Sequence, residues 1–161
     1  MKGNNSFSHL TSSGAARMVN ISQKETTRRM ARAEAWVKVG EELVTKLKSD
    51  GGLVKGNVIE TARIAGIMAA KRTSELIPMC HQIALDAVEI DAELSNDSVR
   101  IESRVHCDGK TGVEMEAMTA AAISALTVYD MVKSAGKGIQ IGPVQLIEKT
   151  GGKSGHWKRE E

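Results

Sequence analysis

Two charged residues near the end of a long alanine-rich stretch are the first candidates for chemistry. Asp130 and Lys133 stand three positions apart, so their side chains share one face if the stretch is helical. On an exposed surface such a pair is a weak ion pair, worth less than about 1 kcal/mol. In a pocket shielded from water the same two groups form an acid–base pair, because desolvation lowers the proton affinity of the lysine. The spacing alone favours the surface ion pair and leaves both alternatives open.

A thiol and an imidazole are adjacent in the short segment that follows Pro78. Cys80 and His81 lie in a predicted loop, where a small buried thiol beside a surface histidine is about as common as a working pair. No HxxxH or CxxC pattern accompanies them, so the sequence predicts no metal site. If His81 acts, we expect it to donate to a phosphate or to carry a proton.

Two glutamates open the long helix that we predict for residues 113–133. Thr111 and Glu114 have the spacing of a capping box, which gives Glu114 a structural role. Glu116 has no such role and is the better candidate for a ligand contact. Glu116 and Asp130 are fourteen residues apart, which corresponds to about 21 Å along a continuous helix. A ligand that touches both must be long, as a nucleoside triphosphate is, or two subunits must share the site.

The elements that position these residues follow from the pattern of apolar positions. Alternating apolar residues predict strands at 29–39, 88–94, 99–107 and 139–147, and a short strand at 18–21. Helices are predicted at 40–48, 57–72 and 113–133, and Pro143 predicts an edge or a bulge in the last strand. This order of elements predicts an α+β fold, a ferredoxin-like antiparallel sheet with helices packed on one face.

The length and composition suit a single domain. The chain has 161 residues, a formal net charge of +2 and 2% aromatic residues, which argues against nucleic acid as a partner. The chain has two cysteines and no apolar run that approaches the ~20 residues of a membrane-spanning helix. We therefore expect a cytoplasmic protein without a membrane partner. We expect a mobile arm at 1–13, one catalytic domain at 14–150 and a flexible Gly/Lys-rich tail at 151–161. Lys149 and Lys153 are candidates for an anion contact, although a solvated tail explains them equally well.

Four strings of the sequence resemble the family of cyclic pyranopterin monophosphate synthases (MoaC). They are KGNV at 55–58, ARIAGIMAAKRTSELIPMCH at 62–81, KTGVEMEAMTAAAISALTVYDMVK at 110–133 and EKTGGKSG at 148–155. The resemblance implies a ferredoxin-like fold and a homo-oligomer, a hexamer arranged as a trimer of dimers with sites between subunits. It also implies a lyase of molybdenum cofactor biosynthesis. This lyase converts 3′,8-cyclo-7,8-dihydro-GTP into cyclic pyranopterin monophosphate and pyrophosphate, with no cofactor.

The resemblance also assigns roles to residues. Asp130 matches the catalytic aspartate of the family, and Lys133 matches its partner lysine. The substrate-binding positions correspond to Met79, Cys80, His81, Glu114, Met115, Glu116, Lys55 and Lys71, and no position corresponds to a metal ligand. Gln82 stands where the family usually has proline, and Val132 where it usually has cysteine. Gln82 therefore puts the rigidity of the binding loop in doubt.

Two other classes of protein fit parts of the same pattern. A non-catalytic ferredoxin-like module that senses a small molecule would bind its ligand without consuming it. An RNA-binding version of that module would need aromatic residues on the sheet, which this chain lacks. A different pterin or nucleotide enzyme, such as a GTP cyclohydrolase, commonly uses zinc, and the sequence offers no convincing ligand set.

Overall fold

The computed structural model describes residues 9–11, 13–49, 57–153 and 155–160 of the chain. Lys55 lies outside these described residues. Within them the chain forms, in order, β1 (Thr27–Lys38), α1 (Glu41–Ser49), α2 (Val58–Lys71), α3 (Thr73–Leu76), β2 (Ala87–Leu94), β3 (Ser98–Gly109), α4 (Glu114–Val132), β4 (Gln140–Thr150) and β5 (Trp157–Lys158). None of the helices in these ranges is long and apolar enough to cross a membrane.

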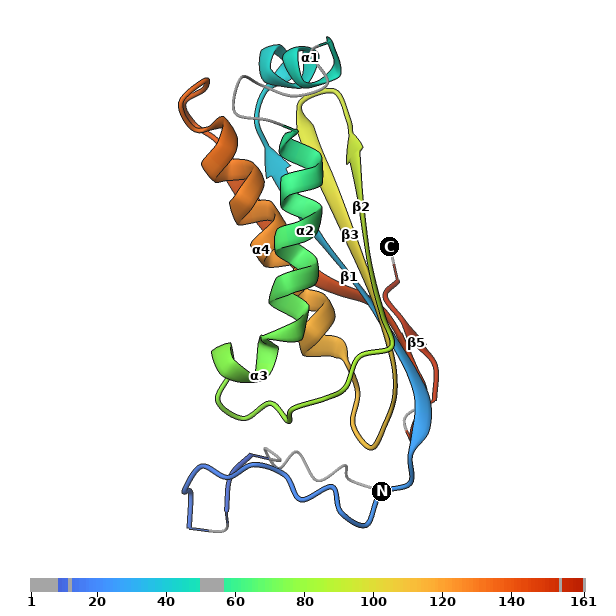
Figure 1. The fold of residues 1–161 in the computed structure, drawn as a ribbon. Helices are drawn as coiled ribbons and strands as arrows, with labels where there is room; N and C mark the ends of the chain where they lie inside the picture. The colour runs from blue at the N-terminus through green and yellow to red at the C-terminus, as the bar shows by residue number, and fades with distance from the viewer. Residues whose placement is uncertain (1–8, 12, 50–56, 154, 161) are drawn as a thin grey trace.

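The strands form one antiparallel sheet in the order β2-β3-β1-β4-β5. The first four of these strands, joined by helices after β1 and after β3, have the ferredoxin-like arrangement that the sequence predicts. The helices α2 and α4 lie side by side over one face of the sheet (Figure 1). The fold class is therefore confirmed, and the two-residue strand β5 extends the sheet beyond β4.

Small side chains let the helices and the sheet approach closely. The inward positions of β1 are fully buried, and they are Ala31, Ala33, Ala35 and Val37. Between the helices, the Ser124 hydroxyl on α4 donates to the Ala62 carbonyl on α2 at 2.9 Å. A Cβ atom at Gly66 would collide with this hydroxyl, so no larger residue fits there without a shift. The alanine-rich helices thus hold their backbones near each other, as their composition predicts.

Two local predictions are wrong, and one is confirmed. Residues 18–21 have no regular secondary structure and pair with no strand among the described residues, so they are not the predicted short strand. The Thr111–Glu114 capping box is also absent, because Val113 is the N-cap of α4 and makes no side-chain cap. The helix predicted at 57–72 is confirmed as α2, and at its start the Asn57 side chain accepts a hydrogen bond from the Glu60 backbone N–H at 3.0 Å.

The face of the sheet away from the helices carries a network of ion pairs. Arg32 contacts Glu102 at 2.7 Å and Glu148 at 2.8 Å, and Arg100 contacts Glu34 at 2.9 Å. These residues alternate along β1 and β3 with the buried apolar positions, so each strand presents one apolar and one charged face. The network connects β1, β3 and β4 across the sheet. The apolar core lies on the opposite face, under the helices.

Candidate functional site

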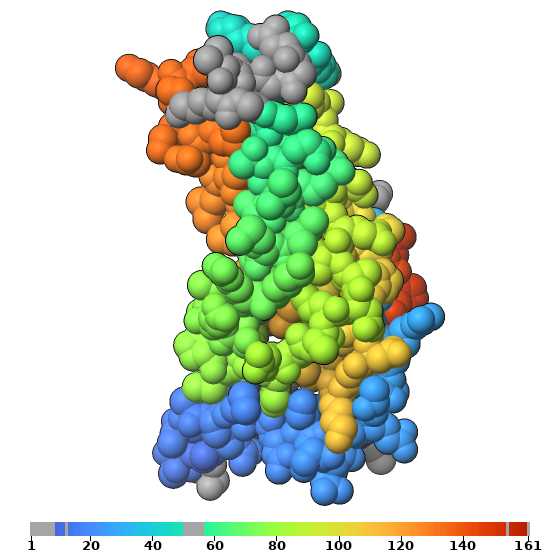
Figure 2. Space-filling view, in the orientation of Figure 1, coloured from blue at the N-terminus to red at the C-terminus, as the bar shows by residue number. Residues whose placement is uncertain are grey.

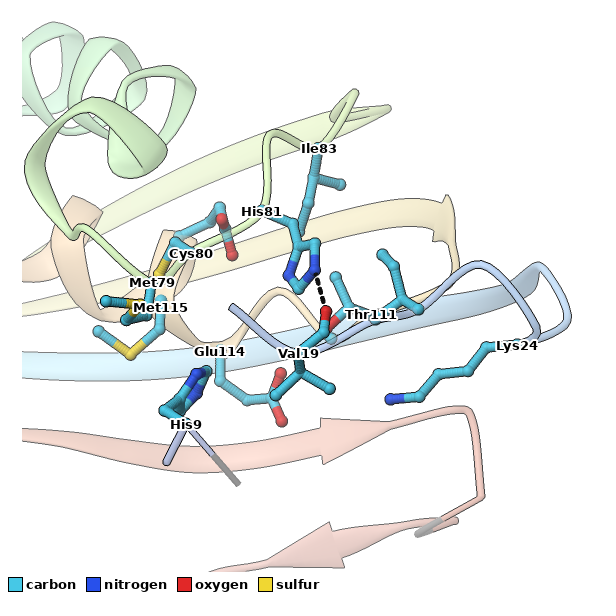
Figure 3. Close-up of a pocket in the computed structure, with 13 residues that line it drawn as sticks. His9, Val19, Lys24, Met79, Cys80, His81, Ile83, Thr111, Glu114 and Met115 are labelled. Carbon is cyan, nitrogen blue, oxygen red and sulfur yellow. Dashed lines mark hydrogen bonds between the residues drawn. The ribbon is translucent and has the colours of Figure 1, made fainter. Parts of the chain in front are cut away.

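A pocket of about 400 Å³ lies at the N-terminal end of α4. Six of the residues assigned by resemblance line it, namely Met79, Cys80, His81, Glu114, Met115 and Glu116. The first three come from the loop after α3, and the last three from the first turn of α4. Figure 3 shows Met79, Cys80 and Met115 gathered at one end of the pocket, with Lys24 at the other. The fold therefore unites two segments that are more than thirty residues apart in the sequence.

His81 is held by a backbone carbonyl of the N-terminal segment. Its Nε2 atom lies 2.7 Å from the Val19 carbonyl oxygen (Figure 3). A carbonyl oxygen only accepts hydrogen bonds, so Nε2 carries the proton and donates it. The other ring nitrogen, Nδ1, is then left for a ligand in the pocket. The Cys80 backbone N–H donates to the Ile77 carbonyl at 3.0 Å and fixes the turn that leads into this loop.

Glu114 is paired with a lysine from the last long strand. The Lys149 ammonium donates to the Glu114 carboxylate at 2.8 Å, and both side chains are about one-third exposed. Gly112 makes room for this arrangement, because a Cβ there would collide with the Glu114 carboxyl group. The pair neutralises one charge at the pocket wall and ties β4 to α4. Its partners are 35 residues apart, so no local spacing predicts it.

Glu116 is the most strongly perturbed carboxyl group of the pocket. The residue is only 4% exposed, and this burial, with the nearby Glu114 charge adding to it, raises the pKa of Glu116 to about 7. Burial also raises the pKa of the Cys80 thiol, and the Glu116 charge adds to that effect. Near neutral pH the Glu116 carboxyl group is thus able either to donate or to accept a proton.

We expect Glu116→Gln to stabilise the protein at high pH. The unfolded chain releases the Glu116 proton near its ordinary pKa of 4.5, whereas the folded chain holds it to about 7. The free energy of unfolding therefore falls as pH rises between these values, by up to about 3 kcal/mol, and the glutamine variant escapes this loss. Urea unfolding of both proteins at pH 5 and pH 8 measures it. If the two proteins differed in free energy of unfolding by the same amount at both pH values, the raised pKa of Glu116 would be contradicted.

The other assigned residues that the structure describes lie away from this pocket. Asp130 and Lys133 lie at the C-terminal end of α4, opposite the pocket, and a hydrogen bond of 2.5 Å joins them. Their side chains are 69% and 54% exposed, and the hydrogen bond raises the pKa of Lys133. Lys71 lines a separate cavity beside β2. Within one chain, Asp130 and Lys133 therefore form the surface ion pair that their spacing favours.

Sequence reasoning missed part of the pocket wall. Four residues of the N-terminal segment line the pocket, namely His9, Val19, Ile21 and Lys24. Val19 and Ile21 are half-buried while their neighbours are exposed. The segment buries those side chains against the pocket instead of joining the sheet. In the part of the chain that the structure describes, no three His, Cys, Asp or Glu side chains form a cluster suited to a metal ion.

The fold and the pocket define a ferredoxin-like α+β protein with a pocket at the N-terminal end of its long helix. The family model described as MoaC family matches residues 18–152. A curated protein of Peptoclostridium acidaminophilum, named cyclic pyranopterin monophosphate synthase, is 47% identical over 154 residues. That alignment covers 96% of this chain and 98% of the relative. The chain belongs to the MoaC family.

Proposed function

We propose that this chain is a cyclic pyranopterin monophosphate synthase, a lyase of molybdenum cofactor biosynthesis. Its substrate is 3′,8-cyclo-7,8-dihydro-GTP, and its products are cyclic pyranopterin monophosphate and pyrophosphate. The observation that carries the proposal is the 47% identity to a relative of that name over nearly the whole length of both chains. The same proposal places the enzyme in the cytoplasm, where free thiols such as those of Cys80 and Cys107 persist.

The chemistry of the pocket fits one half of this reaction. The substrate carries a guanine-derived ring with several N–H donors and a triphosphate with several negative charges. Glu116 is placed to accept from those N–H groups or to exchange a proton with them, because its pKa is about 7. His81, held through Nε2, offers Nδ1 to a phosphate oxygen when the ring is protonated. Lys71 and Lys55 are the further cations that the proposal assigns to the phosphates.

Asp130 and Lys133 supply the acid–base steps in this proposal. Rearranging the cyclised purine into a pterin requires ring opening, entry of water and movement of protons. One of the two groups protonates a ring nitrogen while the other removes a proton. Closing the cyclic phosphate then expels pyrophosphate, and nearby cations stabilise the charge that develops on it.

In this proposal two copies of the chain share each site, and the length of α4 supports that arrangement. Glu116 and Asp130 belong to one continuous helix of 19 residues, and the fourteen residues between them span about 21 Å. The pocket of one copy therefore receives Asp130 and Lys133 from another copy. Apolar side chains on the outer surface of α2 and α4 support such contacts, since Ile64, Met68 and Leu126 are 58%, 48% and 52% exposed. A hexamer built as a trimer of dimers is the assembly that we propose.

A partner chain would also change the chemistry of the lysine. In a single chain Lys133 is exposed, and its hydrogen bond with Asp130 raises its pKa. Contact with a neighbouring pocket would remove water from the pair, and desolvation lowers the pKa of a lysine. The shared site thus converts a surface ion pair into an acid–base pair.

The test is to incubate the purified chain with 3′,8-cyclo-7,8-dihydro-GTP and to measure pyrophosphate and cyclic pyranopterin monophosphate. We expect both products in equal amounts, and neither above background with Lys133→Ala. Binding of the substrate by the folded protein without formation of either product would contradict the proposal. That outcome would instead support the non-catalytic ligand-sensing module.

A further inference from the structure

We propose that the N-terminal segment, defined here as residues 9–11 and 13–26, is a phosphate-binding wall of the pocket, with Lys24 as its main contact. This proposal rests on the proposed function, because it names the residues that hold the triphosphate of that substrate. It goes beyond the residues matched by resemblance, which include none from this segment. The ligand class is a polyphosphate, recognised by lysine and imidazole donors.

Hydrogen bonds and half-buried side chains hold the N-terminal segment against the pocket. In the space-filling view it covers the end of the molecule below α3 (Figure 2). The side chains of Val19 and Ile21 are half-buried and line the pocket. Two side chains of the main domain hold its backbone, His81 through the Val19 carbonyl at 2.7 Å and Lys110 through the Ser22 carbonyl at 2.9 Å. These contacts place Lys24 at the pocket, opposite Cys80 (Figure 3).

The charges around the pocket leave Lys24 for a ligand. Lys149 is paired with Glu114 at 2.8 Å, and Lys110 donates to the segment itself. No described residue forms a hydrogen bond or an ion pair with the Lys24 ammonium, although Lys24 lines the pocket. With Glu114 neutralised and Glu116 partly protonated near pH 7, the pocket carries an excess of positive charge. A polyphosphate chain supplies the negative charge that this arrangement lacks.

The segment also positions His81 for the same ligand. Because the Val19 carbonyl accepts from Nε2–H, Nδ1 is the ring nitrogen left for a ligand. A phosphate oxygen accepts a hydrogen bond from Nδ1 when Nδ1 carries a proton. The segment thus acts on the ligand in two ways: Lys24 contacts it directly, and the Val19 carbonyl positions His81.

The experiment compares Lys24→Ala with wild type in two measurements. Calorimetry with inorganic triphosphate measures the phosphate contact independently of any reaction, and steady-state kinetics with 3′,8-cyclo-7,8-dihydro-GTP measures KM and kcat. We expect the dissociation constant for triphosphate and KM to rise about tenfold, as the loss of one charge-assisted hydrogen bond predicts. We expect kcat to stay within about twofold. Lys24→Arg should recover most of the affinity, and Lys46→Ala, an exposed lysine on α1, should match wild type.

The outcomes separate this proposal from the proposed function. Weaker triphosphate binding by Lys24→Ala supports the role of the N-terminal segment in phosphate binding, even if the wild-type chain turns over no substrate. Unchanged triphosphate affinity in Lys24→Ala overturns the proposed phosphate-binding role of the segment, whether or not the enzyme is active. A failure of the wild-type chain to bind triphosphate at millimolar concentration overturns it as well, and so does a loss of kcat with no change in KM.

Discussion

Asp130→Asn should abolish most formation of cyclic pyranopterin monophosphate while leaving the fold intact. We expect kcat to fall by about 10³-fold, within the range that a general acid–base group contributes. The amide keeps the shape of the side chain and can still accept a hydrogen bond from Lys133, but it cannot take up a proton at neutral pH. The side chain is 69% exposed in the single chain, so its replacement removes no core contact. Initial rates of pyrophosphate release, with circular dichroism and thermal unfolding in parallel, measure the two effects.

A second ion pair on the surface provides the matched control. Glu42 and Lys46 on α1 are 2.7 Å apart, four residues from each other, and exposed. Glu42→Gln makes the same chemical change in a pair of the same kind, away from the proposed site, and should leave the rate unchanged. Near-normal turnover by Asp130→Asn would exclude Asp130 from the acid–base role.

Local patterns predicted most of the fold. Alternation identified β1 and the hairpin of β2 and β3, and Asn57 marked the start of α2. The small residues of α2 and α4 let the two helices pack closely, and a Cβ at Gly66 would collide with the Ser124 hydroxyl. The strand β5 and the four-residue helix α3 were not predicted, because two to four residues carry too little periodicity to be distinguished from a loop.

The candidate site was predictable only in pieces. The resemblance indicated both the loop of Cys80 and His81 and the start of α4, and the fold brings them into one pocket. The ion pair of Glu114 and Lys149 depends on where β4 lies beside α4, which no sequence spacing encodes. The segment around Val19 was predicted to be a short strand, but it buries Val19 and Ile21 against the pocket and does not join the sheet.

The arithmetic of the long helix was the most informative part of the sequence. It indicated that Glu116 and Asp130 cannot meet one compact ligand within a single chain, provided that the helix is continuous. The structure has that continuous helix from Glu114 to Val132. The pocket therefore holds one half of the proposed machinery, and Asp130 and Lys133, the other half, lie at the far end of α4.

Mixed assemblies of two inactive variants test whether two copies share each site. His81→Ala damages the pocket half, and Lys133→Ala damages the acid–base half. In a mixed assembly, some sites join the intact pocket of one copy to the intact acid–base pair of another. Asp130→Asn mixed with Lys133→Ala is the control, because both changes affect the same half, so every site in that mixture keeps a defect.

The decisive measurement is the specific activity of assemblies made by refolding His81→Ala and Lys133→Ala together in equal amounts. Each site draws its two halves independently, so we expect about one quarter of the wild-type activity, far above that of either variant alone. Activity no higher than that of the separate variants, in assemblies shown to contain both chains, would contradict the shared site.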